Sequence, residues 1–185
     1  MTHLKQSQNG VAVPGTQGKS PDDALILIGL GANLPSRFGS PVQTLQAALD
    51  RLGAAGVTPL KRSRFWRSRP VPVSDQPWFV NAVAAVGTAL TPQALLALLH
   101  SVEAEFGRVR GERNAPRLLD LDLLAYGRLV SSESAAELPH PRMAERAFVL
   151  LPLAEIAGGW RHPASGAELA ALIAALPCGQ IVEPL

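Results

Sequence analysis

The sequence predicts an α+β fold in which one antiparallel sheet is built from elements in the order strand, helix, strand, strand, helix, strand. Three observations lead to this fold: a continuous apolar run of strand length, two helical apolar repeats that follow a Ser-Pro and a Thr-Pro pair, and a later run in which leucine alternates with aspartate. The chain has 185 residues, which suits one compact domain and is too short for two full ones. Apolar residues make up 47% of it, so it can bury a real core.

The N-terminal part is expected to pass from a disordered arm into the first strand. Residues 1–21 are polar and lack apolar periodicity, so the domain is expected to span residues 22–185. The first 20 residues also lack the apolar stretch of a signal peptide. The unbroken apolar run Ala24–Leu30 then predicts a strand that is buried on both faces.

The remaining elements are predicted from capping residues, apolar spacing and glycine stops. Helices are expected between Ser40-Pro41 and Gly53, between Thr91-Pro92 and Gly107, over Ala147–Ile156 and over Ser165–Leu176. Further strands are expected at Val57–Trp66, Trp78–Thr88 and Leu118–Ala125. The order up to Ala125 is β-α-β-β-α-β, a ferredoxin-like arrangement with its helices on one face of the sheet. The later helices are expected as C-terminal helical additions packed on this core.

Composition narrows the class of protein. A single cysteine, Cys178, excludes an internal disulfide and a cysteine-based zinc cluster. The apolar runs are far too short to span a membrane. We therefore expect a cytoplasmic protein that does not bind membranes.

Basic residues are concentrated in two segments. The net charge is only +2, but Lys61–Arg69 and Arg108–Arg117 together hold nine basic residues and one acidic residue, so the rest of the chain is acidic overall. Planar guanidinium groups suit bidentate binding of phosphate or carboxylate. Either segment alone is typical of a solvated face, whereas the two together favour an anionic ligand.

The stretch Leu118–Leu124 places two carboxylates on one side of a predicted strand. Asp120 and Asp122 point one way, and the two aspartate Cα atoms are roughly 6–7 Å apart. The alternating leucines point the other way: Leu119, Leu121 and Leu123. Like charges on a partly covered face repel, and divalent cations such as Mg²⁺ would neutralise them. A solvent-facing strand is the plainer interpretation. The adjacent arginine segment instead favours metal-assisted transfer from a triphosphate.

Two other functions remain open at this point. The sequence has no Walker A motif, and Gly29 and Gly31 lack the rest of a dinucleotide fingerprint. An Asp-x-Asp motif also occurs in sugar-nucleotide glycosyltransferases, which typically need a larger nucleotide-binding domain. Phe65 and Trp66 lie among basic residues, as in nucleic-acid binding modules, but that interpretation leaves the aspartate pair unexplained.

Five short motifs occur in the order that is typical of one known family. They are Gly31–Leu34, Asp75–Asn81, Gly107–Arg110, Pro116–Asp122, and Pro139-His140 followed by Arg146–Phe148. Through them the chain resembles the 2-amino-4-hydroxy-6-hydroxymethyl-dihydropterin pyrophosphokinases of folate biosynthesis. The resemblance covers about residues 24–176.

The resemblance implies an enzyme that transfers pyrophosphate from ATP to 6-hydroxymethyl-7,8-dihydropterin and leaves AMP. It implies that Asp120 and Asp122 hold two Mg²⁺ ions and act in catalysis with Arg108 and Arg117, which would face the phosphates. Contacts with ATP are implied for Glu103, Arg110, His140 and Arg146. Contacts with the pterin are implied for Ser68, Val71, Phe79, Asn81 and Phe148, where Asn81 would bond the amide edge and Phe148 would stack on the ring.

The acceptor would be the hydroxyl group of the substrate, so catalysis would rest on positioning and electrostatics rather than on a nucleophilic side chain. The segments Arg67–Pro77 and Gly107–Pro116 are expected to close over both substrates and exclude water. The chain departs from the family at Asn114, where many members have an aromatic residue, and at Pro141. We expect a monomer that binds small molecules and no nucleic acid.

Overall fold

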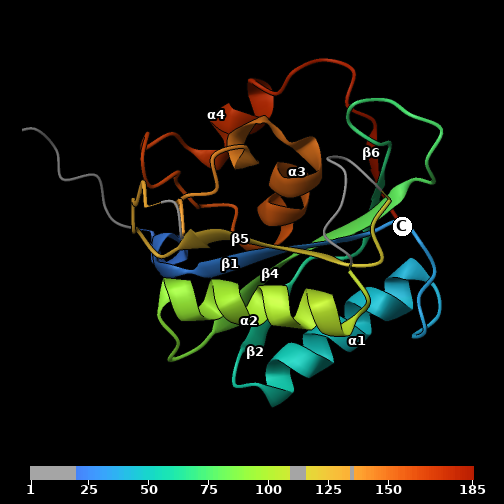
Figure 1. The fold of residues 1–185 in the computed structure, drawn as a ribbon. Helices are drawn as coiled ribbons and strands as arrows, with labels where there is room; N and C mark the ends of the chain where they lie inside the picture. Colours follow the sequence, from blue (N-terminus) through green and yellow to red (C-terminus); the bar gives the residue numbers. More distant parts are fainter. Residues whose placement is uncertain (1–19, 109–115, 134–135) are drawn as a thin grey trace, which may run out of the picture.

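The computed structural model describes residues 20–108, 116–133 and 136–185, and its sheet is antiparallel throughout (Figure 1). The strands are β1 (Ile26–Ala32), β2 (Thr58–Arg62), β3 (Trp66–Ser68), β4 (Phe79–Gly87), β5 (Asp120–Tyr126) and β6 (Val182–Pro184). The strand order is β5-β1-β4-β3-β6, and β2 pairs with β4 beside β3. This order places β1 and β4 in the middle of the sheet, with β5 at one edge.

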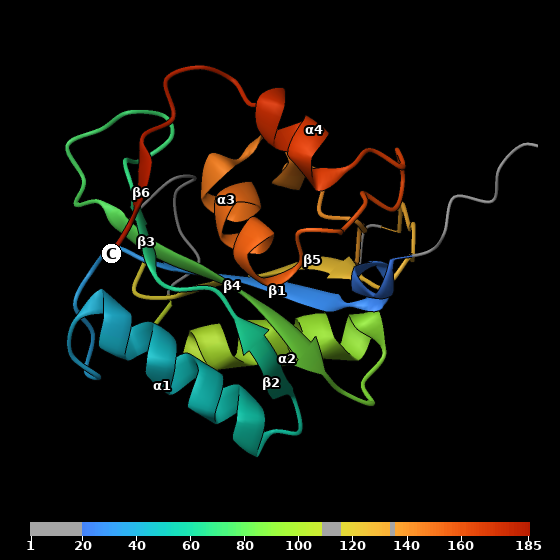
Figure 2. The same cartoon turned by 180° about the vertical axis from the view of Figure 1, so that it is seen from behind.

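The helices cover the sheet on both faces. The α-helices are α1 (Pro41–Ala54), α2 (Pro92–Glu105), α3 (Ala147–Ile156) and α4 (Leu169–Ala174), and the 3-10 helices are η1 (Pro21–Ala24) and η2 (Met143–Glu145). Figures 1 and 2 show α1 and α2 on one face and α3 with α4 on the other. The ferredoxin-like prediction is confirmed for the strand order and for the first two helices. The C-terminal helices pack on the core, as expected, and they do so on the opposite face.

Each face of the sheet has its own hydrophobic core. On one face the leucines of α1 and α2, such as Leu45 and Leu99, pack against Leu30 and Leu121 of the sheet. On the other face residues of α3 and the segment after it pack against β1 and β4. The residues at the centre of this second core include Leu27, Val83, Leu150, Leu153 and Trp160. Because side chains alternate along β1, this strand contributes residues to both cores.

The predicted helix starts are confirmed at both proline-initiated helices. Ser40 Oγ accepts a hydrogen bond from Gln43 N at 3.4 Å, and the Gln43 side chain bonds back to Ser40 N at 2.8 Å, which completes a capping box. Thr91 Oγ1 accepts from Ala94 N at 3.3 Å. Proline follows each cap, where the missing N–H removes no helical bond.

Most strand ends differ from the sequence-based prediction by one or two residues, and larger differences occur in the second strand and near both ends of the chain. The expected second strand divides into β2 and β3, because Ser63 leaves the regular ladder and its Oγ accepts from Val83 N at 3.1 Å. The helix expected over Ser165–Leu176 is only the six residues of α4, and β6 was not predicted. At the N-terminus, Pro21 begins η1 and Ser20 Oγ accepts from Asp22 N, whereas the rest of the expected arm lies outside the described residues.

Candidate active site

Two glycines of β1 form the floor of a cavity on the face of the sheet that α3 covers. Gly31 pairs with Asn81 of β4 on one side and with Asp120 of β5 on the other, and Gly29 pairs with Asp122. A Cβ atom on Gly31 would lie 3.4 Å from Asn81 Oδ1 and 3.8 Å from Asp120 Cβ. Gly31 belongs to the Gly31–Leu34 motif, but sequence analysis assigned no function to either glycine. The structure shows that they keep the space between an amide and two carboxylates open.

The cavity has a volume of about 480 Å³ and collects most of the predicted site residues. Those on its wall are Ser68, Val71, Phe79, Asn81, Arg117, Asp120, Asp122, Arg146 and Phe148. Among the predicted residues that the structure describes, Glu103, Arg108 and His140 do not line it. Arg110 and Asn114 lie outside the described residues, as does most of the segment Gly107–Pro116 whose closure was predicted.

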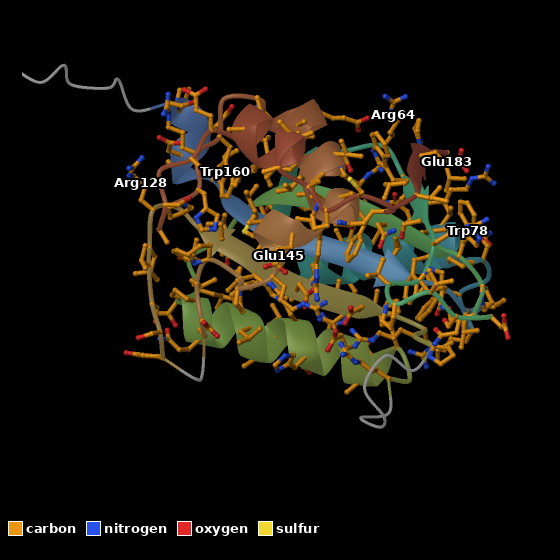
Figure 3. All side chains as sticks on the ribbon, turned by 90° about the horizontal axis from the view of Figure 1, so that it is seen from above. Arg64, Trp78, Arg128, Glu145, Trp160 and Glu183 are labelled. Carbon is orange, nitrogen blue, oxygen red and sulfur yellow. The ribbon has the colours of Figure 1, made fainter. Side chains whose placement is uncertain are left out.

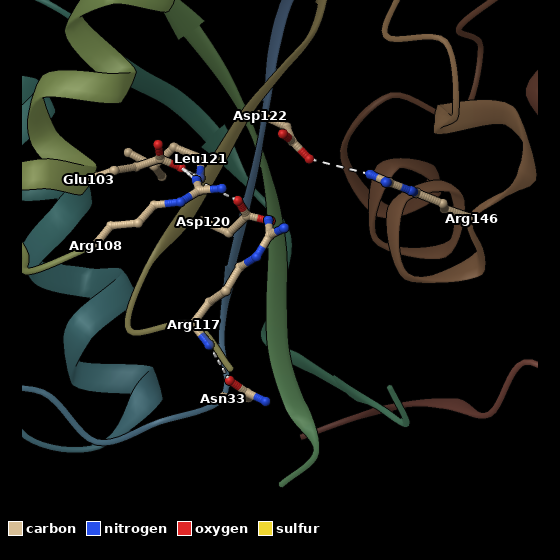
Figure 4. A network of polar contacts seen from close by, with 8 residues as sticks. All are labelled: Asn33, Glu103, Arg108, Arg117, Asp120, Leu121, Asp122 and Arg146. Atoms are coloured by element: carbon tan, nitrogen blue, oxygen red, sulfur yellow. Dashed lines mark hydrogen bonds and ion pairs between the residues drawn. The ribbon is translucent and has the colours of Figure 1, made fainter. Parts of the chain in front are cut away.

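Asp120 is held between two arginines (Figure 4). Arg108 Nη1 donates to Asp120 Oδ1 at 2.7 Å, and Arg117 Nη1 forms an ion pair with Asp120 Oδ2. About a fifth of the Asp120 side chain is exposed. The carboxylate therefore remains open to the cavity while two guanidinium groups balance its charge.

Asp122 lies on the same face of β5 and contacts a different arginine. Arg146 Nη1 lies 3.3 Å from Asp122 Oδ2, at the start of α3 (Figure 4). Burial raises the pKa of Asp122 above its ordinary value, and the neighbouring Asp120 raises this pKa further. Two carboxylates that repel each other at an open cavity fit the site of a divalent cation, which would relieve the repulsion. Two such ligands leave the other positions of a Mg²⁺ shell to water and phosphate oxygens.

Glu103 supports this pair of aspartates from outside the cavity. It is buried at the end of α2, where its Oε1 accepts from Leu121 N at 2.7 Å and forms an ion pair with Arg108. Burial raises its pKa to about 7, although the Leu121 amide and Arg108 both act to lower the pKa. Glu103 thus fixes Arg108 and occupies the free edge of β5 between the two aspartates.

His140 packs beside β5, and its backbone N donates to Leu124 O at 2.8 Å. Its Nδ1 accepts from Arg142 N at 3.1 Å, so this nitrogen carries no proton in that bond. Burial lowers the pKa of the imidazole, and the negative charge of Asp122 opposes that shift. Both observations favour a neutral ring near Asp122.

On the β4 side of the cavity, the amide of Asn81 lies beside aromatic and apolar side chains. Asn81 is 5% exposed, and its Nδ2 donates to Ser68 Oγ at 3.0 Å. Phe148 follows Arg146 by two residues, and the guanidinium carbon of Arg146 lies 5.5 Å from its ring centre. Phe79 and Val71 complete this side of the wall.

A sequence model of the 7,8-dihydro-6-hydroxymethylpterin-pyrophosphokinase family matches residues 27–158. The chain belongs to this pyrophosphokinase family. It is 44% identical over 131 residues to the 2-amino-4-hydroxy-6-hydroxymethyldihydropteridine pyrophosphokinase of Methylorubrum extorquens, covering 70% of this chain and 80% of that one. With the enzyme of the same name from Pseudomonas aeruginosa the identity is 42% over 153 residues, covering 82% and 91%.

Longer relatives match over only part of their length. The chain is 39% identical over 151 residues to the folic acid synthesis protein fol1 of Pneumocystis carinii, which covers 82% of this chain and 20% of that protein. A crystal structure of wild-type Plasmodium falciparum HPPK-DHPS with pteroate superposes with a TM-score of 0.64 at 11% identity, covering 82% of this chain and 44% of that one. The latter likeness shows that the fold is that of the pyrophosphokinase family.

The two basic segments of this pyrophosphokinase make different contacts. In the second segment, Arg108 and Arg117 form ion pairs with Asp120. In the first segment, Arg62 and Arg64 instead lie over the rings of Phe65 and Trp66, with 4.3 and 5.5 Å to the ring centres. The same segment also forms ion pairs, of Arg64 with Glu155 of α3 and of Arg67 with Glu183 of β6. Figure 3 shows Arg64 and Glu183 on the same side of the molecule.

Sequence analysis missed two parts of the site. Asn33 is 2% exposed and joins Arg117 to the segment before β4 through its bonds to Gln76 and Pro77. Its position in the Gly31–Leu34 motif was the one available signal. The segment from Pro177 to Ile181 also lines the cavity, but no pattern in the sequence marked it.

Proposed function

We propose that Asp120 and Asp122 hold two Mg²⁺ ions against the phosphates of ATP, and that Asn81 and Phe148 hold the acceptor. The chain is a pyrophosphokinase of folate synthesis, whose reaction transfers pyrophosphate from ATP to 6-hydroxymethyl-7,8-dihydropterin and gives AMP and the pterin diphosphate. The observation that carries the proposal is the register of β1. Gly31 has Asn81 on one side and Asp120 on the other, so both substrate sites share one open floor.

Magnesium bound here would neutralise phosphate charge and lower the pKa of the attacking hydroxyl. Arg108 and Arg117 already lie on Asp120 and would contact the phosphates from the same side. Arg146 would approach from the α3 side beside Asp122. The planar guanidinium groups would stabilise the negative charge on the transferred group. Glu103 would act on the phosphate-binding arginines through its ion pair with Arg108. His140 and Arg110 complete the proposed contacts with ATP.

The acceptor would lie across the floor from the aspartates. Two strand spacings separate β4 from β5, which is about 10 Å. A bicyclic pterin bonded to Asn81 can extend its hydroxymethyl group across that distance. Phe148 offers a ring to stack on, and Ser68 keeps the Asn81 amide oriented through its hydroxyl. Val71 and Phe79 would cover the remaining apolar surface of the ring.

These residues catalyse transfer by position. The nucleophile is the substrate hydroxyl, and the cavity wall brings it into the same space as the phosphates. Apolar groups around the pterin keep water, a competing acceptor, away from the transferred phosphate. We propose that the protein acts on these small molecules as a monomer in the cytoplasm. Among the described residues no helix is long and apolar enough to cross a membrane.

The test is AMP formation from ATP. We expect AMP release to require Mg²⁺ and 6-hydroxymethyl-7,8-dihydropterin together, with the pterin diphosphate formed in equal amount. Phe148→Ala should raise the KM for the pterin more than the KM for ATP. Leu129→Ala is the matched control, because Leu129 is exposed and is not part of the cavity wall. Equal changes in both KM values for Phe148→Ala would contradict the proposed division of the cavity.

A further inference from the structure

The segment of residues 177–181 forms one wall of the cavity, although it lies beyond the residues that the family model matches. It leads directly into β6, which pairs with β3. Arg69 N donates to Ile181 O at 3.1 Å, next to the Ser68 that bonds Asn81. The segment therefore connects the β3 side of the cavity with the start of α3.

The start of α3 does not cap itself. Arg146 occupies the N-cap position, and its side chain has no hydrogen-bond acceptor. Its carbonyl accepts from Val149 N and Leu150 N, at 3.0 Å each. The N–H of Ala147, which is buried, still needs a partner in the first turn. Gln180 supplies it, because Gln180 Oε1 accepts from Ala147 N at 2.9 Å.

The same amide group makes a second bond to the other side of Arg146. Gln180 Nε2 donates to Glu145 O at 2.8 Å, so one side chain binds the backbone immediately before and immediately after Arg146. Arg146 is extended, with φ −110° and ψ 109°, between η2 and α3. Its orientation thus depends on how these two helices are held together.

We propose that Gln180 is a positioning residue that orients Arg146 toward Asp122 and the ATP phosphates. The inference rests on the proposed role of Arg146. Arg146 Nη1 is 3.3 Å from Asp122 Oδ2, and a small rotation of its backbone would move the end of this long side chain out of reach. The effect of Gln180 passes through its two bonds to the backbone and not through a contact with Asp122.

Gln180→Met tests the proposal, because it keeps the length of the side chain and removes both hydrogen bonds. We expect kcat/KM for ATP to fall about tenfold, as the loss of a net hydrogen bond or two predicts. The dissociation constant of the pterin, measured by fluorescence, should change less than about twofold, because Asn81 and Ser68 stay in place. Gln46→Met is the matched control, since Gln46 is exposed on α1, bonds Asp50 and is not part of the cavity wall. Unchanged kcat/KM for ATP in Gln180→Met would overturn the proposal.

A double-mutant cycle separates this inference from the proposed function. In an Arg146→Ala background, Gln180→Met should cause no further loss in kcat/KM for ATP. If Arg146→Ala retains normal kcat/KM, the proposed role of Arg146 fails. If Arg146→Ala is impaired and Gln180→Met still adds its full effect, only the positioning role of Gln180 is overturned.

A second variant distinguishes a loss of positioning from a loss of folding. Gln180→Glu keeps an acceptor for Ala147 N at a helix N-terminus, where negative charge is favourable, and loses the donor to Glu145 O. Circular dichroism should show that it folds like the wild type, and kcat/KM for ATP should still fall. Full efficiency in this folded variant would contradict the proposal as clearly as full efficiency in Gln180→Met.

Discussion

Asn33 and Arg117 are joined by two hydrogen bonds that run in opposite directions. Asn33 N donates to Arg117 O at 3.0 Å, and Arg117 N donates to Asn33 Oδ1 at 2.7 Å. Both bonds use the backbone of Arg117, so its guanidinium group is left to meet Asp120. The anchoring of residue 117 is therefore independent of its side chain, and a substitution there tests the chemistry of the side chain alone.

Arg117→Lys should lower the rate of pyrophosphate transfer about tenfold or more while the protein stays folded, because lysine keeps the charge and loses the planar pair of donors. The affinity for a non-hydrolysable ATP analogue should change less than the rate. Single-turnover measurements and calorimetry separate the two quantities. Arg128→Lys is the matched control, since Arg128 pairs with Asp23 away from the cavity. A normal transfer rate in Arg117→Lys would count against the phosphate contact.

Asp122→Asn should reduce Mg²⁺-dependent AMP formation at least about a hundredfold, because a lost metal ligand removes several kcal/mol of transition-state stabilisation. The same variant should unfold at a temperature no lower than the wild type at pH 7, since burial and Asp120 already disfavour a charge there. Asp120→Asn should be equally inactive and less stable, because Arg108 and Arg117 lose their common partner.

Differential scanning calorimetry with and without Mg²⁺ and ATP analogue measures the stability of both aspartate variants. The ligands should raise the unfolding temperature of the wild type and not that of the variants. Asp50→Asn, on the exposed surface of α1, is the control. Near-normal Mg²⁺-dependent turnover in both site variants would contradict the proposal that Asp120 and Asp122 bind Mg²⁺.

Asn81→Ala should weaken pterin binding by about 1–3 kcal/mol, roughly five- to 150-fold, because a buried hydrogen-bond partner is left unsatisfied. Ser68→Ala should have a smaller effect in the same direction, since the Ser68 hydroxyl only orients the Asn81 amide. Isothermal titration with the pterin and with an ATP analogue compares the two ligands. If Asn81→Ala weakens both equally, Asn81 is a structural residue of β4.

Glu103 should make the ligand-free protein less stable as the pH rises. Its pKa is raised from 4.5 to about 7, so the folded protein keeps a proton that the unfolded chain has already lost. The stability from Glu103 is therefore complete below pH 4.5 and is lost as the pH rises through about 7. As the pH rises from 4.5 to about 7, the free energy of unfolding of Glu103→Gln should increase relative to that of the wild type by up to about 3 kcal/mol. Urea denaturation across this pH range measures the difference, and a constant difference would contradict the raised pKa.

The elements with local signals were predicted from the sequence. Ser40 and Thr91 cap helices with bonds to residues three positions away, and the alternation around Asp120 and Asp122 requires only the pleat of a strand. What the sequence did not show depends on contacts between distant residues. Gln180 bonds to Ala147 across 33 positions, and the break at Ser63 depends on Val83 in another strand. Glu103 was expected beside ATP, and only the packing of α2 on β5 reveals that it lies beneath Arg108.

The two glycines of β1 that form the cavity floor lower the stability of the strand and keep the active site open. Glycine in a strand interior costs about 0.5–1 kcal/mol relative to alanine, and β1 has it at two of seven positions. A Cβ at position 29 would meet Leu124 at an ordinary contact distance of 3.4 Å, so a side chain there could be accommodated. Selection for heat-resistant variants would thus favour larger residues at these glycine positions of β1. Each such substitution would reduce the space where both substrates meet.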